Sequence, residues 1–363
     1  MRVSMDEQIF AIQRYGGISR LFAELASQFS SGSIAEVELM PLNAPIINRY
    51  ILENPPLAAK LKARESRNEW LALARYASRI KTHPTSEIVH NTFYLPHGLA
   101  PIRGAKRIVT VHDMIPELMP QTRRRLDLIT MKRRYVEQAD HVICVSHAAK
   151  NDLLRVYGDV QAPISVVHHG VDQRFSPKAE KHPSLPDKYL LFVGNRNQYK
   201  DANVLFRAFA GLRETHSDLD LLCIGGGPFT ANERQLIHLL GIQNVSSQIN
   251  LPDREMVSAY AHAEIFVFPS QFEGFGLPAL EAMACGVPTV LAAATSLPEV
   301  GGDAAEYFKP GDPDDLELVL SKLLNNDDRR RELQSKGLAR AQHFTWKKTA
   351  EETALVYQKA LSR

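Results

Sequence analysis

Short apolar runs alternate with amphipathic segments along almost the whole chain, and this alternation limits the possible folds more than any other feature. The runs are rich in Val, Ile and Leu without regular polar interruptions, as in parallel strands covered on both faces. We expect strands at 107–111, 141–145, 164–168, 189–193, 219–224, 249–251, 265–269 and 288–292. We expect helices at 19–29, 124–138, 148–157, 201–216, 254–262, 278–285 and 314–325. This order predicts an α/β fold with right-handed crossovers.

A break in the pattern indicates two domains. Residues 175–186 (FSPKAEKHPSLP) are rich in proline and charge and lack an apolar period, as in a linker, and a new buried strand follows them. The length of 363 residues suits two domains of about 150 to 200 residues each. We expect a first domain at 1–178, a second at 179–345, and a terminal segment at 346–363 that is mostly one amphipathic helix.

Composition argues against several classes of protein. The net charge of +2 gives no reason to expect a nucleic-acid partner. Cys144, Cys223 and Cys285 are far apart and form no C-x-x-C pair, which argues against a disulfide framework or zinc site and for a reducing compartment. The first ten residues do not resemble a signal peptide, and no apolar run approaches the ~18 residues of a membrane span. We expect a cytoplasmic protein, with peripheral membrane contact left open.

The segment 268–286, FPSQFEGFGLPALEAMACG, carries the strongest chemical signal. Glu273 and Glu281 have seven residues between them, and a glycine-rich loop leads from the first glutamate into the helix that carries the second. Free N–H groups at residues 275–277 could bind phosphate or sugar oxygens, and the carboxylates could accept hydrogen bonds from sugar or ribose hydroxyls. A glycine-rich loop before a solvated helix is the simpler alternative.

A second candidate is the turn GNRNQYKD at 194–201, which places Arg196 and Lys200 between a buried strand and a helix. A diphosphate leaving group needs its charge neutralised as its bond breaks, and a bidentate Arg with a point-charged Lys can supply this. Taken alone, two such residues are more often solvated surface charges.

Two further patterns are weaker. Basic triplets at 123–125 and 132–134 lie along one expected helix and could approach anionic lipid or a diphosphate-linked acceptor, but a solvated helix face is the better interpretation. The sequence GGGP at 225–228 lacks the G-K-[S/T] of a phosphate loop, so we interpret it as a strand-to-helix turn. We find no D-x-D motif and no ligand cluster with metal spacing, and we therefore expect no essential metal.

The segment 268–286 resembles the E-x7-E signature of the retaining glycosyltransferases of family four, which have the GT-B fold. Further segments resemble family motifs in the same order, namely YGGISR at 15–20, VHD at 111–113, VS at 145–146, HGVD with Phe175 at 169–175, and GNRNQYK at 194–200. The resemblance covers nearly the whole chain. It implies two Rossmann-like domains facing each other across a cleft, acceptor on the first and donor on the second, with the terminal helix crossing back to the first domain.

The resemblance also implies a role for each matching residue. The implied catalytic residues are His112, over the donor sugar; Arg196 and Lys200, which clamp the diphosphate; and Glu273, near the transferred sugar. Implied donor contacts also come from Gly16, Gly17, Gly194, Leu251, Phe275, Gly276, Leu277 and Glu281, the last through the ribose hydroxyls. Candidates for the acceptor side are His90, Tyr94 and Asp113. The alternatives are a satisfied histidine at residue 112, a plain tight turn for the glycine pair, and a core role for the aromatic residues near 94.

By this resemblance the chain transfers a hexose, with retention, from a nucleoside diphosphate sugar to a glycan or lipid-linked glycan. The departing phosphate oxygen takes the acceptor proton during a same-face attack. The string DEQIF with YGGISR most resembles bacterial enzymes of surface-polysaccharide assembly, several of which are mannosyltransferases, and so favours GDP-mannose. A UDP-hexose donor and a non-catalytic sugar-nucleotide-binding protein are the alternatives. No cofactor is expected.

Overall fold

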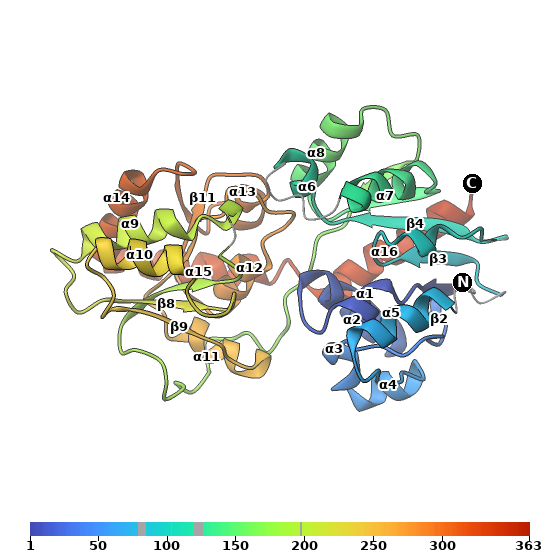
Figure 1. The fold of residues 1–363 in the computed structure, drawn as a ribbon, viewed down its shortest axis with the longest axis horizontal. Coiled ribbons are helices and arrows are strands. Elements are labelled where there is room, and N and C mark those ends of the chain that lie inside the picture. The colour runs from blue at the N-terminus through green and yellow to red at the C-terminus, as the bar shows by residue number, and fades with distance from the viewer. Residues whose placement is uncertain (79–84, 103, 120–125, 197) are drawn as a thin grey trace. The chain divides into compact units, whose positions relative to one another are not determined.

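The computed structural model describes residues 1–78, 85–102, 104–119, 126–196 and 198–363 (Figure 1). The chain forms two compact units: unit 1 is Met1–Gly170 with Trp346–Arg363, and unit 2 is Val171–Thr345. The expected boundary at 178/179 therefore lies inside unit 2. The reason is that the preceding segment already packs there: the Val171 N–H donates to the Phe344 carbonyl at 3.0 Å, and the Phe175 ring meets the Tyr260 ring edge-on.

Unit 1 is built on a parallel sheet that, in the described residues, has six strands in the order β2-β1-β3-β4-β5-β6. The strands are β1 (Arg2–Met5), β2 (Glu38–Leu39), β3 (Ile88–Asn91), β4 (Lys106–Val111), β5 (His141–Cys144) and β6 (Ile164–Val166). The helices are α1 (Gln8–Ile12), α2 (Gly17–Ser30), α3 (Arg49–Leu52), α4 (Pro55–Lys60), α5 (Glu69–Ser78), η1 (Pro96–Leu99), α6 (Ile115–Leu118), α7 (Leu126–Glu137), α8 (His147–Tyr157) and α16 (Trp346–Leu361). Every residue of β3 and β5 is buried, as expected for interior strands covered on both faces.

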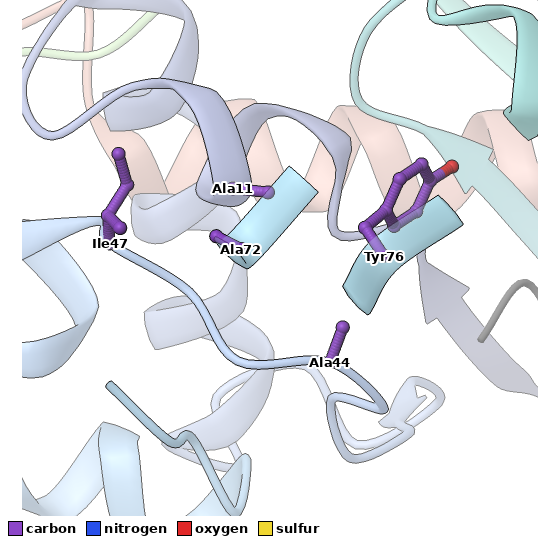
Figure 2. Packing of buried hydrophobic residues seen from close by; sticks show 5 residues of the cluster. All are labelled: Ala11, Ala44, Ile47, Ala72 and Tyr76. Atoms are coloured by element: carbon purple, nitrogen blue, oxygen red, sulfur yellow. The ribbon is translucent and has the colours of Figure 1, made fainter. Parts of the chain in front are cut away.

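Helices α1 and α5 are joined by a small apolar cluster of Ala11, Ala44, Ile47, Ala72 and Tyr76 (Figure 2). The two helices contribute fully buried alanines to it, which lets their backbones approach closely. The Ile47 N–H also donates to the carbonyl of Phe10 in α1, at 2.9 Å. Because α1 directly precedes the turn at residues 13–16, this cluster anchors the segment that carries the glycine pair.

The final helix, α16, completes the core of unit 1, to which the chain returns after forming unit 2. It packs against α2 and against strands β4 and β5. Its Tyr357 is fully buried, and the Tyr357 hydroxyl lies 2.7 Å from Nδ1 of His90 on β3. The core of unit 1 is thus shared between the beginning and the end of the chain.

Unit 2 has a second parallel sheet, with six strands among the described residues in the order β12-β11-β10-β7-β8-β9. The strands are β7 (Tyr189–Val193), β8 (Asp220–Ile224), β9 (Ser246–Ile249), β10 (Ile265–Phe268), β11 (Thr289–Ala292) and β12 (Glu306–Phe308). The helices are η3 (Gln198–Lys200), α9 (Ala202–Leu212), α10 (Ala231–Leu239), η4 (Asp253–Glu255), α11 (Met256–Ala261), α12 (Leu277–Ala284), α13 (Leu297–Gly301), α14 (Pro313–Leu324) and α15 (Asp327–Ala341). The strand order reverses between β7 and β10, and open α/β sheets bind ligands beside such a reversal, at the carboxyl ends of the strands.

The α/β architecture predicted from the sequence is confirmed, with most expected strands and helices present to within a few residues. The expected strand at 249–251 is wrong in position, because β9 covers Ser246–Ile249. Several short or polar elements were not predicted, among them β1, β2, β12, α10 and α15. In the described ranges, no helix combines the length and apolar character that a membrane span requires.

Candidate functional site

The loop between β10 and α12 folds as the segment 268–286 predicts. Gly276 precedes the first helical residue with φ of 106°, a left-handed conformation that favours glycine. A Cβ atom on Gly276 would also lie 2.8 Å from Cδ2 of Leu297, so a side chain there would have to displace the buried Leu297 side chain. The N–H of Leu277, in the first turn, has no acceptor within the helix and is placed to meet an anion or a sugar oxygen.

Two residues that the sequence analysis did not single out hold this loop in place. The Glu273 N–H donates to Oγ1 of Thr295 at 3.0 Å. The fully buried Ser296 hydroxyl lies 3.0 Å from the Glu273 carbonyl and 2.9 Å from the Phe275 carbonyl. Thr295 has φ of 47°, a conformation that costs about 1 to 3 kcal/mol outside glycine and clusters at ligand sites. Thr295 and Ser296 follow the expected strand at 288–292. Because all strands of a parallel sheet end at the same edge, this position was the signal in the sequence that could have placed them near Glu273.

Lys200 and Glu273 form an ion pair at the reversal between β7 and β10. Their side chains are only 15% and 10% exposed, and the Lys200 ammonium lies 5.1 Å from the centre of the Phe268 ring. The two loops are also joined by the Gln271 N–H, which donates to the Tyr199 carbonyl at 2.8 Å. Two residues predicted from separate motifs are therefore brought together, and an incoming anion would compete with one carboxylate for the lysine.

Arg196 does not face this pair, contrary to the expectation that both cations clamp one ligand. Its side chain is 3% exposed, and its Nε donates to Oε1 of Glu233 at 2.8 Å. Its Nη1 donates to the Gly225 carbonyl at 2.6 Å, and its Nη2 donates to the Gly227 and Pro228 carbonyls at 2.7 and 3.1 Å. The guanidinium is therefore occupied by the glycine turn after β8. Sequence spacing placed Arg196 near the site but did not indicate which way its side chain turns.

Glu281 lies on α12, where the Tyr260 hydroxyl donates to its Oε2 at 2.9 Å. Tyr260 is fully buried on α11, and its ring packs edge-on against Phe266 and Phe175. This rigid tyrosine, which the sequence analysis missed, fixes the orientation of the Glu281 carboxylate.

Gly194 and Leu251 follow the carboxyl ends of β7 and β9, two strands of the same sheet that are separated by β8. Gly194 follows β7 with φ of 135°, and its N–H donates to the carbonyl of Ile224 at 2.9 Å. Leu251 is partly buried and follows β9 by one residue. Both positions agree with the edge at which a ligand of unit 2 would bind.

His112 in unit 1 follows the buried strand β4 and is itself 7% exposed. Neither of its ring nitrogens has a hydrogen-bond partner in the described residues. Burial first, and then the neighbouring His169, His90 and Lys132, hold the pKa of this imidazole well below its ordinary value. His112 is therefore a neutral ring with an unused donor and an unused acceptor, the properties needed to bind a hydroxyl.

The glycine pair precedes α2. Gly16 has φ of 155°, and a Cβ atom on it would lie 2.5 to 2.7 Å from the side-chain atoms of Gln13. That side chain is held in place because its Oε1 accepts the Ser19 N–H at 3.0 Å. Gly17 is exposed at the first helical position, where an N–H has no acceptor within the helix. The pair thus opens a helix N-terminus to solvent.

His90 and Tyr94, the candidates for the acceptor side, are both buried in the core of unit 1. His90 is buried with both nitrogens occupied: Nδ1 by the Tyr357 hydroxyl, and Nε2 by the Thr110 hydroxyl at 2.8 Å. Burial lowers the pKa of His90 to about 3. Tyr94 is also buried, donates its hydroxyl to the Thr110 carbonyl at 2.7 Å, and lies 3.4 Å from the backbone nitrogen of His112. Both residues support the His112 turn from within the core.

Asp113 is part of the same turn. Its Oδ1 accepts the N–H of Ile115 at 3.0 Å, and its carbonyl accepts a hydrogen bond from the Lys132 ammonium at 2.9 Å. Lys132 is buried and paired with Glu117 at 2.9 Å, and Glu117 also accepts the Tyr157 hydroxyl at 2.9 Å. A glycan hydroxyl that binds Oδ1 of Asp113 would therefore compete with the N–H of Ile115 for the same oxygen.

The basic triplets divide along the expected helix. Residues 123–125 lie outside the described residues. Within the second triplet, Lys132 is buried rather than solvated, because it is part of the ion pair behind the His112 turn. Arg133 is exposed and pairs with the exposed Glu137 at 3.0 Å, as a solvated helix face predicts.

Two family descriptions match the chain: Glycosyl transferases group 1 over residues 174–340, and Glycosyltransferase Family 4 over residues 15–175. The chain is 31% identical over 297 residues to MMP alpha-(1->4)-mannosyltransferase of Mycolicibacterium hassiacum, covering 76% of this chain and 71% of that one. It is 27% identical over 324 residues to O-antigen chain mannosyltransferase B of Escherichia coli, covering 85% and 82% respectively.

Solved structures show the same fold. Sucrose-phosphate synthase from Thermosynechococcus elongatus superimposes with a TM-score of 0.77 at 18% identity, over 99% of both chains. Anabaena Alr3699/HepE in complex with UDP-glucose gives a TM-score of 0.75 at 17% identity, also over 99% of both. Two parallel-sheet units, one with paired charges at the reversal of its strand order, are the parts of a GT-B glycosyltransferase. The chain belongs to the group 1 glycosyltransferases of family four, as the sequence motifs predicted.

Proposed function

We propose that this glycosyltransferase moves an α-mannosyl group, with retention, from GDP-mannose to a glycan or lipid-linked glycan acceptor. The observation that carries the proposal is the Lys200–Glu273 pair beside the N-terminus of α12. A cation, a glutamate and helix N–H groups meet where a parallel sheet binds its ligands. These groups match a nucleoside diphosphate sugar, which presents a dianionic leaving group next to a ring of hydroxyls.

Lys200 is the cation that supports neutralisation of the leaving group. Its present partner is a single carboxylate, so a diphosphate oxygen can replace Glu273 without stranding further groups. The released Glu273 carboxylate then accepts hydrogen bonds from the hydroxyls of the sugar. Glu281, held by Tyr260, accepts the ribose hydroxyls in the same way. Because a preorganised cation stabilises charge that develops in the transition state, Lys200 contributes to the rate as well as to binding.

His112 of unit 1 supplies a neutral imidazole. A neutral ring can donate to one oxygen and accept from another, whereas an imidazolium can only donate. We propose that His112 positions a sugar hydroxyl while the departing phosphate oxygen takes the acceptor proton. No metal is part of this proposal, because Lys200 and the helix N-terminus supply the positive charge.

The choice of mannose rests on the relatives. MMP alpha-(1->4)-mannosyltransferase, O-antigen chain mannosyltransferase B and the serotype-specific mannosyltransferase WbdA of Escherichia coli all carry mannosyl transfer in their names. The second candidate is a UDP-hexose, which is favoured by the Anabaena structures in complex with UDP and with UDP-glucose. The name of the O-antigen relative supports a polysaccharide or lipid-linked acceptor, and for such an acceptor we propose contact with the membrane surface.

The test is thermal unfolding of the full chain with GDP, UDP, ADP, CMP or dTDP, each with and without magnesium. A ligand that binds only the folded state at 100 times its Kd adds about 2.7 kcal/mol of stability. We expect GDP to raise the melting temperature most, with no need for magnesium. A shift with UDP alone would select the second candidate, and a shift that depends on magnesium would contradict the metal-free proposal. No shift with any nucleotide would favour a protein without donor binding.

A further inference from the structure

We propose that Arg196 is a positioning residue that fixes the glycine turn at 225–228, and that the donor diphosphate is neutralised without it. The inference rests on the proposed nucleotide-sugar site of unit 2. It concerns a residue that the family resemblance assigns to the diphosphate. The geometry around Arg196 points to a different partner.

The turn after β8 needs an external support. Gly225, Gly226 and Gly227 all have left-handed φ angles, of 89°, 72° and 73°. Successive glycines have no side chains to anchor them and lose more conformational freedom on ordering than other residues do. Arg196 supplies the missing anchor, because its guanidinium donates to carbonyls at both ends of the turn, those of Gly225 and of Gly227 with Pro228.

The charge of Arg196 is balanced inside the same assembly. Its Nε donates to Glu233, whose other oxygen, Oε2, accepts the Thr230 N–H at 2.6 Å while the Glu233 N–H bonds the Thr230 hydroxyl. Glu233 therefore caps α10 and holds the arginine at once. The Phe229 ring lies 5.0 Å from the guanidinium carbon and covers it. If Arg196 turned toward a phosphate, Oε1 of the buried Glu233 and three backbone carbonyls would lose the donor that they have here.

The supported turn borders the site edge. A Cβ on Gly226 would lie 3.2 Å from the Asn195 Cα and from the Gly194 carbonyl, so the turn after β8 packs directly on the turn after β7. The latter turn leads to Lys200. A shift of the glycine turn would therefore change the shape of the edge that receives the nucleotide, while the cation that faces the diphosphate would stay in place.

Lys200 and Arg196 lie four positions apart in the sequence. They differ in the number of interactions that a phosphate would have to displace in order to bind them. Lys200 has one charged partner, whereas the arginine has a carboxylate, three carbonyls and an aromatic face. Lysine cannot replace the arginine here, because an ammonium lacks the planar fork that reaches separated acceptors.

The experiment is calorimetric measurement of the affinities of the full chain for GDP, GMP, UDP and UMP. The variants are Arg196→Lys, Glu233→Gln and Lys200→Met, with the exposed Arg207→Lys of α9 as the matched control. We expect Arg196→Lys to weaken the diphosphate and the monophosphate by the same factor, about tenfold, and Glu233→Gln to do so less strongly. We expect Lys200→Met to weaken the diphosphate about 10- to 100-fold more than the monophosphate.

Each other result has a distinct meaning. A loss in Arg196→Lys that is confined to the diphosphate would show a clamp and overturn the inference. A lower melting temperature with unchanged affinities would show a purely structural residue and also overturn it. If Arg196→Lys fails to fold, Glu233→Gln provides the same comparison, since it keeps the shape and removes the charge. A wild type that binds none of these nucleotides, although folded, would instead reject the proposed function.

Discussion

Each unit contains its own parallel sheet, with six strands among the described residues. The two units differ in where charged residues lie at the carboxyl ends of these strands. In unit 1 the turn after β4 carries the buried, neutral His112, and the charged pair Lys132–Glu117 lies beside the same turn in the core. In unit 2 both cations follow β7 and are paired with carboxylates, Lys200 with Glu273 of the loop after β10 and Arg196 with Glu233 of α10.

The difference follows the chemistry of the proposed ligands. A sugar hydroxyl needs a neutral donor and acceptor, so in unit 1 the buried charge serves only to hold the turn. A diphosphate needs a cation, and an unpaired buried cation is costly, so unit 2 keeps both Lys200 and Arg196 with a carboxylate. Of these two, Lys200 has the pair that is simple enough to exchange with a ligand.

The contrast between the two units depends most on the Lys132–Glu117 pair, which must stabilise unit 1. Removing one partner of a buried ion pair leaves an uncompensated charge, so we expect Lys132→Met to destabilise unit 1 by about 3 to 5 kcal/mol. Both tryptophans of the chain, Trp70 and Trp346, belong to unit 1, so their fluorescence during urea unfolding reports on that unit alone.

Two further variants control this measurement. The exposed Arg133→Met on the same helix should change stability by less than about 0.5 kcal/mol. The double variant Lys132→Met with Glu117→Gln should recover part of the loss, because the lone buried carboxylate is gone. Equal effects of Lys132→Met and Arg133→Met would mean that the buried pair contributes nothing to unit 1.

A smaller expected effect is a loss of folding stability at low pH that comes from His90. Burial depresses the pKa of His90 to about 3, so this ring stays neutral in the folded chain and gains a proton on unfolding below its ordinary value of 6.5. Because the unfolded state then binds more protons, stability falls as the pH falls, by about 2 kcal/mol between pH 7 and pH 5 for this residue. The tryptophan signal in wild type and in His90→Gln measures it: the variant should lose that part of the pH dependence. Identical pH slopes would contradict a neutral buried His90.

The smallest expected effect concerns the hydrogen bond from the uncharged Tyr260 to Glu281 in unit 2. Tyr260→Phe removes one hydrogen bond to Glu281 and should weaken GDP binding about fivefold, roughly 1 kcal/mol. The same variant should bind 2′-deoxy-GDP almost as well as the wild type does, because the lost orientation matters only when the ribose hydroxyl is present. A wild-type ratio of the two affinities in the variant would show that Tyr260 does not act through Glu281.

The sequence predicted the parts of the fold that carry a strong apolar pattern. Strand β7 and helix α16 occur at their expected residues, 189–193 and 346–361. The missed α15 is polar on nearly every side and is held by an Asn326 cap and by neighbouring pairs such as Arg331 with Asp328. Such a helix has no apolar stripe to detect.

The sequence predicted where the candidate site residues lie along the chain, but it did not predict which groups their side chains contact. Lys200 and Glu273 meet because both follow neighbouring parallel strands, which sequence order and strand assignment can indicate. The role of His90 depends on Tyr357, 267 positions away, and that of Arg196 on carbonyls of a different turn. No local pattern encodes such long-range contacts, so a buried histidine and a bound arginine both looked like ligand-binding residues.

The closure of unit 1 by α16 sets an order of events during synthesis. The ribosome makes β1 to β6 and α1 to α8 of unit 1, then all of unit 2, before Trp346 emerges. At about 5 to 20 residues per second this interval lasts roughly 10 to 40 seconds. During that time the faces of β4 and β5 that α16 will cover are bare, and His90 lacks its tyrosine. Unit 2, which is continuous in the chain, is free to fold first, so the half that we propose binds the donor is complete while the other half still needs protection from aggregation.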